Sequence, residues 1–100
     1  MANVELYVYP PLSYRMSSQR VGILVLEQTI HQGETLGDLL RKLWDGNPDA
    51  WQDIYDAQAR QIKPIIATLL NAKALSNPTA AQTPLADGDQ ITFHLVYGGG

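Results

Sequence analysis

The chain has 100 residues, a net charge of −3 and 45% hydrophobic residues, which fits one globular domain with one modest core. Charged residues make up only 17% of the chain and acidic ones outnumber basic ones. This argues against a nucleic-acid partner, because binding a phosphate backbone needs a basic surface. The chain has no cysteine, so any sulfur chemistry must use sulfur brought from outside. No apolar run could span a bilayer and no signal-peptide pattern is visible, so we expect a cytoplasmic protein without membrane contact.

The N-terminal third predicts two strands. Residues 4–9 alternate between apolar and other side chains, which is the period of a half-buried strand and puts Tyr7 and Tyr9 together on its outer face. The two prolines that follow end this strand, since proline has no N–H to donate. We expect a polar loop over 12–19 and a second strand over 21–30, joined to the first as a wide antiparallel hairpin.

The middle of the chain predicts a long amphipathic helix. Thr35 is suited to cap its first turn, and Asp38, three residues later, completes a capping box. Gly46 is expected to end the helix. One apolar stripe at helical spacing follows the cap and should cross the sheet; its members are Leu36, Leu39, Leu40 and Leu43.

A second helix is predicted from Pro48 to about Gln61, because proline is favoured in a first turn. Within it we expect Trp51 in the core rather than on a contact surface. The same region is acidic, but it lacks the spacing of a calcium loop. We interpret these acidic residues as a solvated helix face. The alternative is that their charge attracts a basic partner. The acidic residues are Asp45, Asp49, Asp53 and Asp56.

The last third predicts further strands separated by turns. An Asp-Gly turn at residues 87–88 leads into the final strand, 90–96. Alternation in that strand puts Phe93 toward the core and His94 and Val96 on the outer face. Before it we expect a buried strand over 65–70, a turn at Asn71, a short strand over 74–76 and a loop over 77–84.

Together these elements predict an α+β fold: one domain over 1–97, with a sheet of four to five strands on one main helix and a second short helix. The last strand should lie beside the first, so that the uncovered sheet face displays the outward residues of both. Residues 98–100 form a flexible glycine tail in this interpretation. Glycine has no Cβ, so such a tail can enter a slot too narrow for other residues. The alternative is an ordinary frayed end.

The segment Leu85-Ala86-Asp87-Gly88-Asp89-Gln90-Ile91-Thr92-Phe93, preceded by Leu70-Asn71 and followed by terminal glycines, resembles the MoaD/ThiS family of β-grasp sulfur carriers. The resemblance covers most of the chain, from the first hairpin to the tail, and implies the ubiquitin-like β-grasp fold. Two features depart from the family pattern. The family usually ends in two glycines where this chain has three, and the region 51–61 is longer than in the smallest members. Whether Gly100 or Gly99 is the mature terminus stays open.

The resemblance implies chemistry done on the protein rather than by it. An activating enzyme of the MoeB/ThiF type would use ATP and magnesium to adenylate the Gly100 carboxylate, which Gly98 and Gly99 present. A sulfur donor protein would then supply the sulfur of a thiocarboxylate. The acceptor would be an enzyme such as the large subunit of molybdopterin synthase, and no cofactor would be bound to the chain itself.

Partner binding is assigned, as a hypothesis, to the outer sheet face: Tyr7, Tyr9, His94, Val96 and the flanking Tyr97. Exposed aromatic residues are enriched at interface cores. An enzyme is not indicated, because neither histidine is spaced with acids as a metal or catalytic site and no phosphate-binding glycine loop is visible. Two alternatives remain: a ubiquitin-like modifier conjugated to target lysines through the same terminus, and an interaction module with an inert tail.

Overall fold

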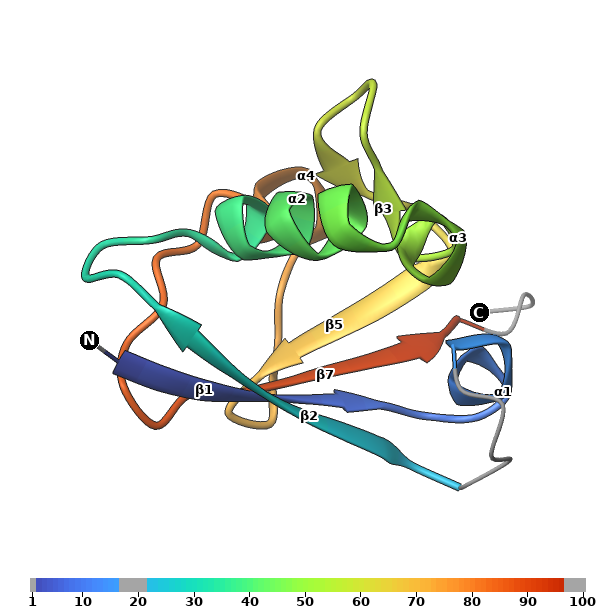
Figure 1. Ribbon diagram of the computed structural model, residues 1–100, viewed down its shortest axis with the longest axis horizontal. Helices are drawn as coiled ribbons and strands as arrows, with labels where there is room; N and C mark the ends of the chain where they lie inside the picture. The colour runs from blue at the N-terminus through green and yellow to red at the C-terminus, as the bar shows by residue number, and fades with distance from the viewer. Residues whose placement is uncertain (1, 17–21, 97–100) are drawn as a thin grey trace.

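A five-stranded mixed sheet carries one long helix on one of its faces (Figure 1). The computed structural model describes residues 2–16 and 22–96. In chain order the elements are β1 (Ala2–Val8), α1 (Leu12–Met16), β2 (Leu24–Ile30), α2 (Leu36–Gly46), α3 (Pro48–Trp51), β3 (Tyr55–Asp56), β4 (Gln61–Ile62), β5 (Ile66–Leu70), β6 (Lys73–Ala74), α4 (Asn77–Ala80) and β7 (Gln90–Leu95).

The strand order in the main sheet is β2-β1-β7-β5-β6, with β3 and β4 forming a separate small hairpin. β1 pairs antiparallel with β2 and parallel with β7, so the predicted first hairpin and the predicted pairing of first and last strands are confirmed. β7 pairs antiparallel with β5 on its other side. The last strand is therefore central, and both of its neighbours fix its direction.

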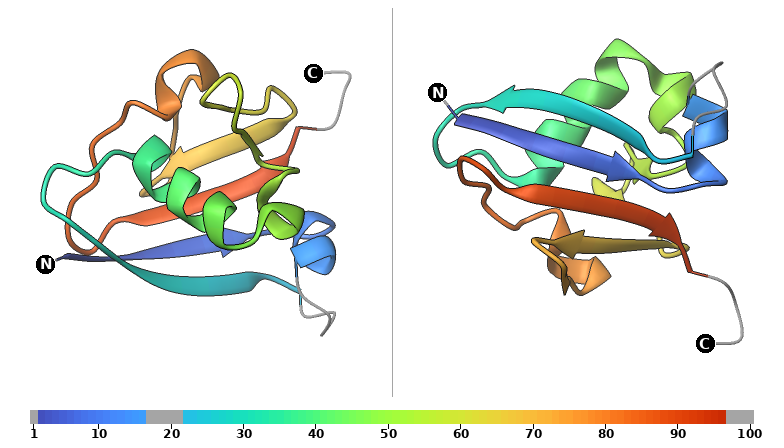
Figure 2. Two further views of the ribbon diagram at one scale, coloured as in Figure 1. Left: turned by 45° about the horizontal axis from the view of Figure 1, so that its top comes forward. Right: turned by 90° about the horizontal axis from the view of Figure 1, so that it is seen from below.

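The core lies between the sheet and α2. Alternate residues of the strands point toward the helix, and the leucine stripe of α2 points back at them, as predicted. Burial of each such side chain contributes about 1.5–3 kcal/mol. The opposite face of the sheet carries no helix, as the view from below shows (Figure 2, right). The largest buried side chains include Val4, Leu6, Val8, Ile66, Ile91 and Phe93 from the sheet, with Leu36, Leu39 and Leu40 from α2.

Both ends of α2 follow from local chemistry. The predicted capping box is confirmed: the Asp38 N–H donates to Thr35 Oγ1 over 3.1 Å, and the Thr35 N–H donates to Asp38 Oδ2 over 3.0 Å. The helix includes Gly46, but that glycine has no left-handed φ, so the expected glycine stop is not what ends it. Asn47 does, with φ −155°, because the residue before Pro48 is disfavoured in the helical region.

Residue 37 is glycine because another backbone passes very close to it. The Gly37 N–H donates to the carbonyl oxygen of Ala81 over 2.7 Å, and a Cβ at position 37 would itself lie 2.7 Å from that oxygen. The first turn of α2 is thus pressed against the chain that follows α4. No side chain fits between them.

The prediction of a helix to Gln61 is wrong, because α3 ends at Trp51 and a short hairpin follows. Asp56 Oδ1 accepts the backbone N–H groups of Gln58 and Ala59, over 3.0 and 3.1 Å. This local bonding turns the backbone away from a helix. Trp51 lies in the core, 4% exposed, as expected.

Two predicted loops contain short helices. In α1 the Ser13 hydroxyl donates to the Gly22 carbonyl over 2.6 Å, and Arg15 Nε lies 2.7 Å from Asp53 Oδ2 beyond α3. In α4 the Asn77 side chain donates to the Lys63 carbonyl over 3.2 Å. One helical turn is too short to show a hydrophobic period in the sequence. These contacts with distant residues therefore decide that the two segments are helical. The short strand expected over 74–76 is instead β6.

None of the described helices is long and apolar enough to cross a membrane. The longest of them, α2, has eleven residues.

Candidate functional site

The uncovered sheet face carries an apolar group of side chains at the end where β1 and β7 finish. We call it the outer-face patch. Four predicted residues lie in it, and the structure adds two more, one from β2 and one from the position directly before β5. The patch consists of Tyr7, Tyr9, Val25, Ile65, His94 and Val96.

Tyr9 and His94 hold each other in place within the patch. Their ring centroids are 6.4 Å apart with planes at 62°, an edge-to-face contact. Tyr9 is 41% exposed and His94 is half-buried. His94 Nδ1 lies 3.1 Å from the carbonyl oxygen of Leu95, which only accepts, so the bond requires the proton on Nδ1. This leaves Nε2 as an acceptor on the imidazole.

Tyr7 is half-buried, and its hydroxyl donates to Glu5 Oε1 over 3.2 Å. Loss of hydration raises the pKa of the Tyr7 phenol, and the charge of Glu5 and the hydrogen bond to it raise the pKa further. The phenol therefore keeps its proton at neutral pH. It presents a polar rim beside the apolar part of the patch, an arrangement common at protein interfaces.

Sequence reasoning missed Val25 and Ile65 as patch members, which are 49% and 56% exposed. Val25 lies directly opposite Tyr7 in the β1–β2 pairing. The runs that contain these two residues are almost continuously apolar, and such runs predict strands buried on both faces. Only the one-sided placement of α2 leaves their outward members exposed.

Val96, the last residue that the structure describes, lies at the edge of the patch. The Val96 N–H donates to the Ile65 carbonyl over 2.8 Å, which extends the β7–β5 pairing by one residue, and Val96 is 50% exposed. Tyr97 and the three glycines Gly98, Gly99 and Gly100 lie outside the described residues. The structure thus fixes the patch and the position of residue 96.

The Asp-Gly turn that carried the family resemblance lies at the opposite end of β7, where it ties three strands together. Gly88 has φ +87°, and its N–H donates to the Asn3 carbonyl over 2.8 Å. Asn71, with φ +52°, accepts from the Gln90 N–H and donates to Asp89 Oδ1, each over 2.9 Å. These bonds fix β7 against β5 and β1 at its start, and so set the register that carries Val96 to the patch.

Glu34 lies in the loop before α2 and is 9% exposed, which makes it the most buried carboxylate among the described residues. Burial alone would raise its pKa, but the pairing with Lys42 and the N–H of His31 together hold the pKa below its usual value. Lys42 Nζ lies 2.8 Å from Glu34 Oε2, and the His31 N–H donates to Oε1 over 2.9 Å. The charged carboxylate thus fixes the loop between β2 and α2.

Three of the four acidic residues predicted around the second helix have structural partners as well. Asp45 pairs with Arg41 and Asp53 pairs with Arg15, while Asp56 caps its own turn. Over residues 2–16 and 22–96, no three histidine or acidic side chains gather in a way that could hold a metal ion.

A five-stranded mixed sheet around one long helix, with an exposed face beside the last strand, is the ubiquitin-like β-grasp fold. This class contains small sulfur carriers and ubiquitin-like modifiers. The ThiS family model matches residues 18–100, and the chain belongs to that family. None of the curated proteins compared with the chain matches it.

Solved structures show the same fold at low sequence identity. The crystal structure of small archaeal modifier protein 1 from Haloferax volcanii matches with a TM-score of 0.73 and 18% identity, covering 99% of this chain and 100% of that one. Small archaeal modifier protein 1 from Methanosarcina acetivorans gives 0.66 and 22%, with coverages of 100% and 98%. A putative molybdopterin converting factor, subunit 1, from Pyrococcus furiosus gives 0.66 and 13%, with coverages of 97% and 100%.

Proposed function

We propose that the chain is a sulfur carrier whose C-terminal glycine carboxylate is adenylated by a partner enzyme of the MoeB/ThiF type and then converted to a thiocarboxylate. The observation that carries the proposal is the match to the ThiS family over residues 18–100, a range that includes the glycines. In this role the protein is a co-substrate, and ATP and magnesium belong to the activating partner.

The chemistry explains why activation comes first. A carboxylate is a poor electrophile because its oxygen is a poor leaving group, so ATP first converts it to an acyl adenylate with release of pyrophosphate. Free sulfide displaces AMP to give the thiocarboxylate directly. The outer sulfur of a donor persulfide displaces AMP to give an acyl disulfide, and a thiol of the donor system then cleaves its S–S bond, releasing the thiocarboxylate and leaving a disulfide. The thiocarboxylate formed is a good nucleophile, and an acceptor enzyme uses it. A glycine end suits this sequence because no side chain shields the reacting carbon, while the partner supplies positioning and charge stabilisation.

The outer-face patch supports docking of such partners. Ordering each tail residue costs about 1–2 kcal/mol, so the tail alone binds weakly and the folded body must contribute. The patch offers Tyr9, Val96 and Ile65, each more than 40% exposed, next to the point where the tail begins. Aromatic and aliphatic residues of this kind form the centres of interfaces. Tyr97 adjoins them in sequence and is assigned the same role.

We propose a molybdopterin-type acceptor, the large subunit of molybdopterin synthase, as the first candidate. Its support is the fold shared with the Pyrococcus furiosus protein described as a putative molybdopterin converting factor. A ubiquitin-like modifier is the second candidate function, and its support is the fold shared with the two archaeal modifier proteins. Activation of the terminus is common to both routes.

Intact mass spectrometry of the protein from its native host tests the proposal. Replacement of one oxygen by sulfur at the terminus is expected for the carrier, and the same spectrum identifies the mature end as Gly99 or Gly100. Isopeptide-linked forms at target lysines would instead establish the modifier. An unmodified protein whose function survives deletion of Gly99 and Gly100 would refute both and leave an interaction module.

A further inference from the structure

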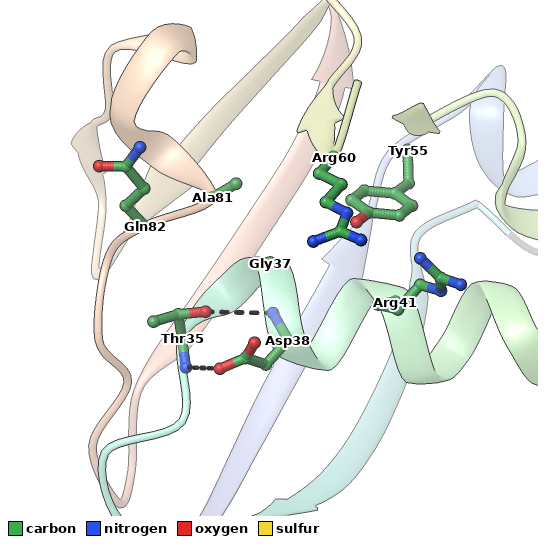
Figure 3. A pocket seen from close by; sticks show the side chains of 8 residues that line it. All are labelled: Thr35, Gly37, Asp38, Arg41, Tyr55, Arg60, Ala81 and Gln82. Carbon is green, nitrogen blue, oxygen red and sulfur yellow. Dashed lines mark hydrogen bonds between the residues drawn. The ribbon is translucent and has the colours of Figure 1, made fainter. Parts of the chain in front are cut away.

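A hollow of about 440 Å³ lies on the helix side of the molecule, away from the outer-face patch (Figure 3). Three segments far apart in the sequence surround it: the first turns of α2, the β3–β4 hairpin and the chain after α4. Its volume falls within the usual range for small-ligand pockets. The residues around it are Thr35, Gly37, Asp38, Arg41, Tyr55, Arg60, Ala81 and Gln82.

Tyr55 is the first sign that the hollow binds something. Its side chain is almost fully buried, 3% exposed, yet its hydroxyl has no hydrogen-bond partner in the described part of the chain. Figure 3 shows this hydroxyl turned toward the guanidinium of Arg60. The buried side-chain atoms without a partner among the described residues do not include this hydroxyl, so it is open to the hollow rather than enclosed. A ligand in the hollow can therefore form a hydrogen bond with it.

Two arginines give the hollow its charge. Arg60 makes no ion pair or hydrogen bond with any described residue. Arg41 reaches Asp45 Oδ1 through Nε at 3.1 Å, and its guanidinium carbon lies 5.8 Å from the centroid of the Trp44 ring, so its terminal nitrogens make no hydrogen bond with a described residue. The terminal nitrogens of both guanidiniums therefore remain available. Guanidinium groups bind carboxylate and phosphate oxygens through paired hydrogen bonds.

The backbone conformation of Arg60 is a further indication of a binding site. Arg60 has φ +56°, a left-handed conformation uncommon for a residue with a side chain. Such conformations persist where the surrounding structure enforces them, and they concentrate at functional sites. Here the conformation belongs to the turn that holds the Arg60 side chain over the hollow.

Asp38 limits where the negative charge of a ligand can lie in the hollow. Its Oδ2 accepts the Thr35 N–H in the capping box, so one carboxylate also lines the hollow, on the α2 side. The N–H groups of Leu36 and Gly37 are already used by carbonyls of the chain after α4. The anionic part of a ligand must therefore lie at the end with Arg60, Arg41 and Tyr55.

From these observations we infer that the hollow is a binding site for a small molecule carrying a phosphate or carboxylate group, held by Arg60, Arg41 and the Tyr55 hydroxyl. The site is separate from the glycine terminus, and its occupation does not depend on the proposed function.

Titration of the ¹⁵N-labelled full-length protein, without any activating enzyme, tests this inference. Sodium phosphate and sodium succinate are added separately, with ionic strength held constant by sodium chloride. We expect saturable shifts of the amide signals of Gly37, Arg60 and Gln82 with at least one of the two. The stronger of the two responses identifies the preferred oxyanion.

Variants locate the site. Arg60→Gln and Tyr55→Phe are each expected to weaken binding by about tenfold or more, because each removes a hydrogen bond to a charged ligand. Lys73→Gln removes one positive charge from an exposed position on β6 and should leave binding unchanged. Thermal unfolding verifies that each variant is folded. Shifts that fail to saturate, that chloride reproduces, or that persist in Arg60→Gln would overturn the inference.

Discussion

The same substitution at the two ends of α2 should change stability in opposite directions. Alanine is favoured over glycine within a helix by about 0.8–1.0 kcal/mol. At Gly37, however, the added Cβ would lie 2.7 Å from the Ala81 carbonyl oxygen and 3.1 Å from the Ala81 Cβ. Overpacking costs about 1–3 kcal/mol, and the 2.7 Å hydrogen bond from the Gly37 N–H, worth about 1 kcal/mol, must also lengthen.

For Gly37→Ala we therefore expect a net loss of about 1–3 kcal/mol in the free energy of unfolding. Gly46→Ala is the matched control, because a Cβ there meets no atom within 4 Å. It should gain up to about 1 kcal/mol. Urea denaturation measures both, and a change of 1 kcal/mol corresponds to about 4–8 °C in Tm for a domain of this size. A Gly37→Ala protein as stable as the wild type would refute the close packing of α2 against the chain after α4.

Two further substitutions test the patch and the buried carboxylate. Val96→Asp should lower kcat/KM for adenylation by the host's activating enzyme about tenfold or more without unfolding the protein. Gln52→Asp introduces the same charge at an exposed position on the helix side and should leave kcat/KM unchanged. Equal values of kcat/KM for the two variants would show that the patch takes no part in docking. Glu34→Gln should cost about 1 kcal/mol at pH 7. The pKa of Glu34 in the folded protein lies below its ordinary value of 4.5. The difference in unfolding free energy between wild type and variant should therefore persist above pH 4.5 and shrink as the pH falls through the folded pKa. Urea denaturation at several pH values measures this difference, and a constant difference would contradict the pairing with Lys42.

The two ends of β7 have separate tasks in this molecule. At its start, Asn71 and the turn at residues 87–89 fix the register through backbone and side-chain hydrogen bonds. Directly after its end, Val96 still pairs with Ile65 and belongs to the outer-face patch. Asn71 and the Asp-Gly turn thus have a structural role, because they set the register of the strand that leads to Val96.

The sequence alone determined what depends on local patterns. Alternation and turn chemistry gave β1, β7 and the Asp-Gly turn, and helical spacing with a capping box gave α2 and its buried stripe, because each of these signals repeats over several residues or uses a specific local bond. It also predicted four members of the outer-face patch from strand alternation. The functional role of those residues and of the glycines stays a prediction.

Only the tertiary structure decided features that rest on contacts between distant segments. The single-turn helices α1 and α4 are stabilised by partners such as Gly22 and Lys63, and no period can reveal a single turn. The hollow around Tyr55 and Arg60 was invisible in sequence, because it exists only where the hairpin and the chain after α4 pack against α2.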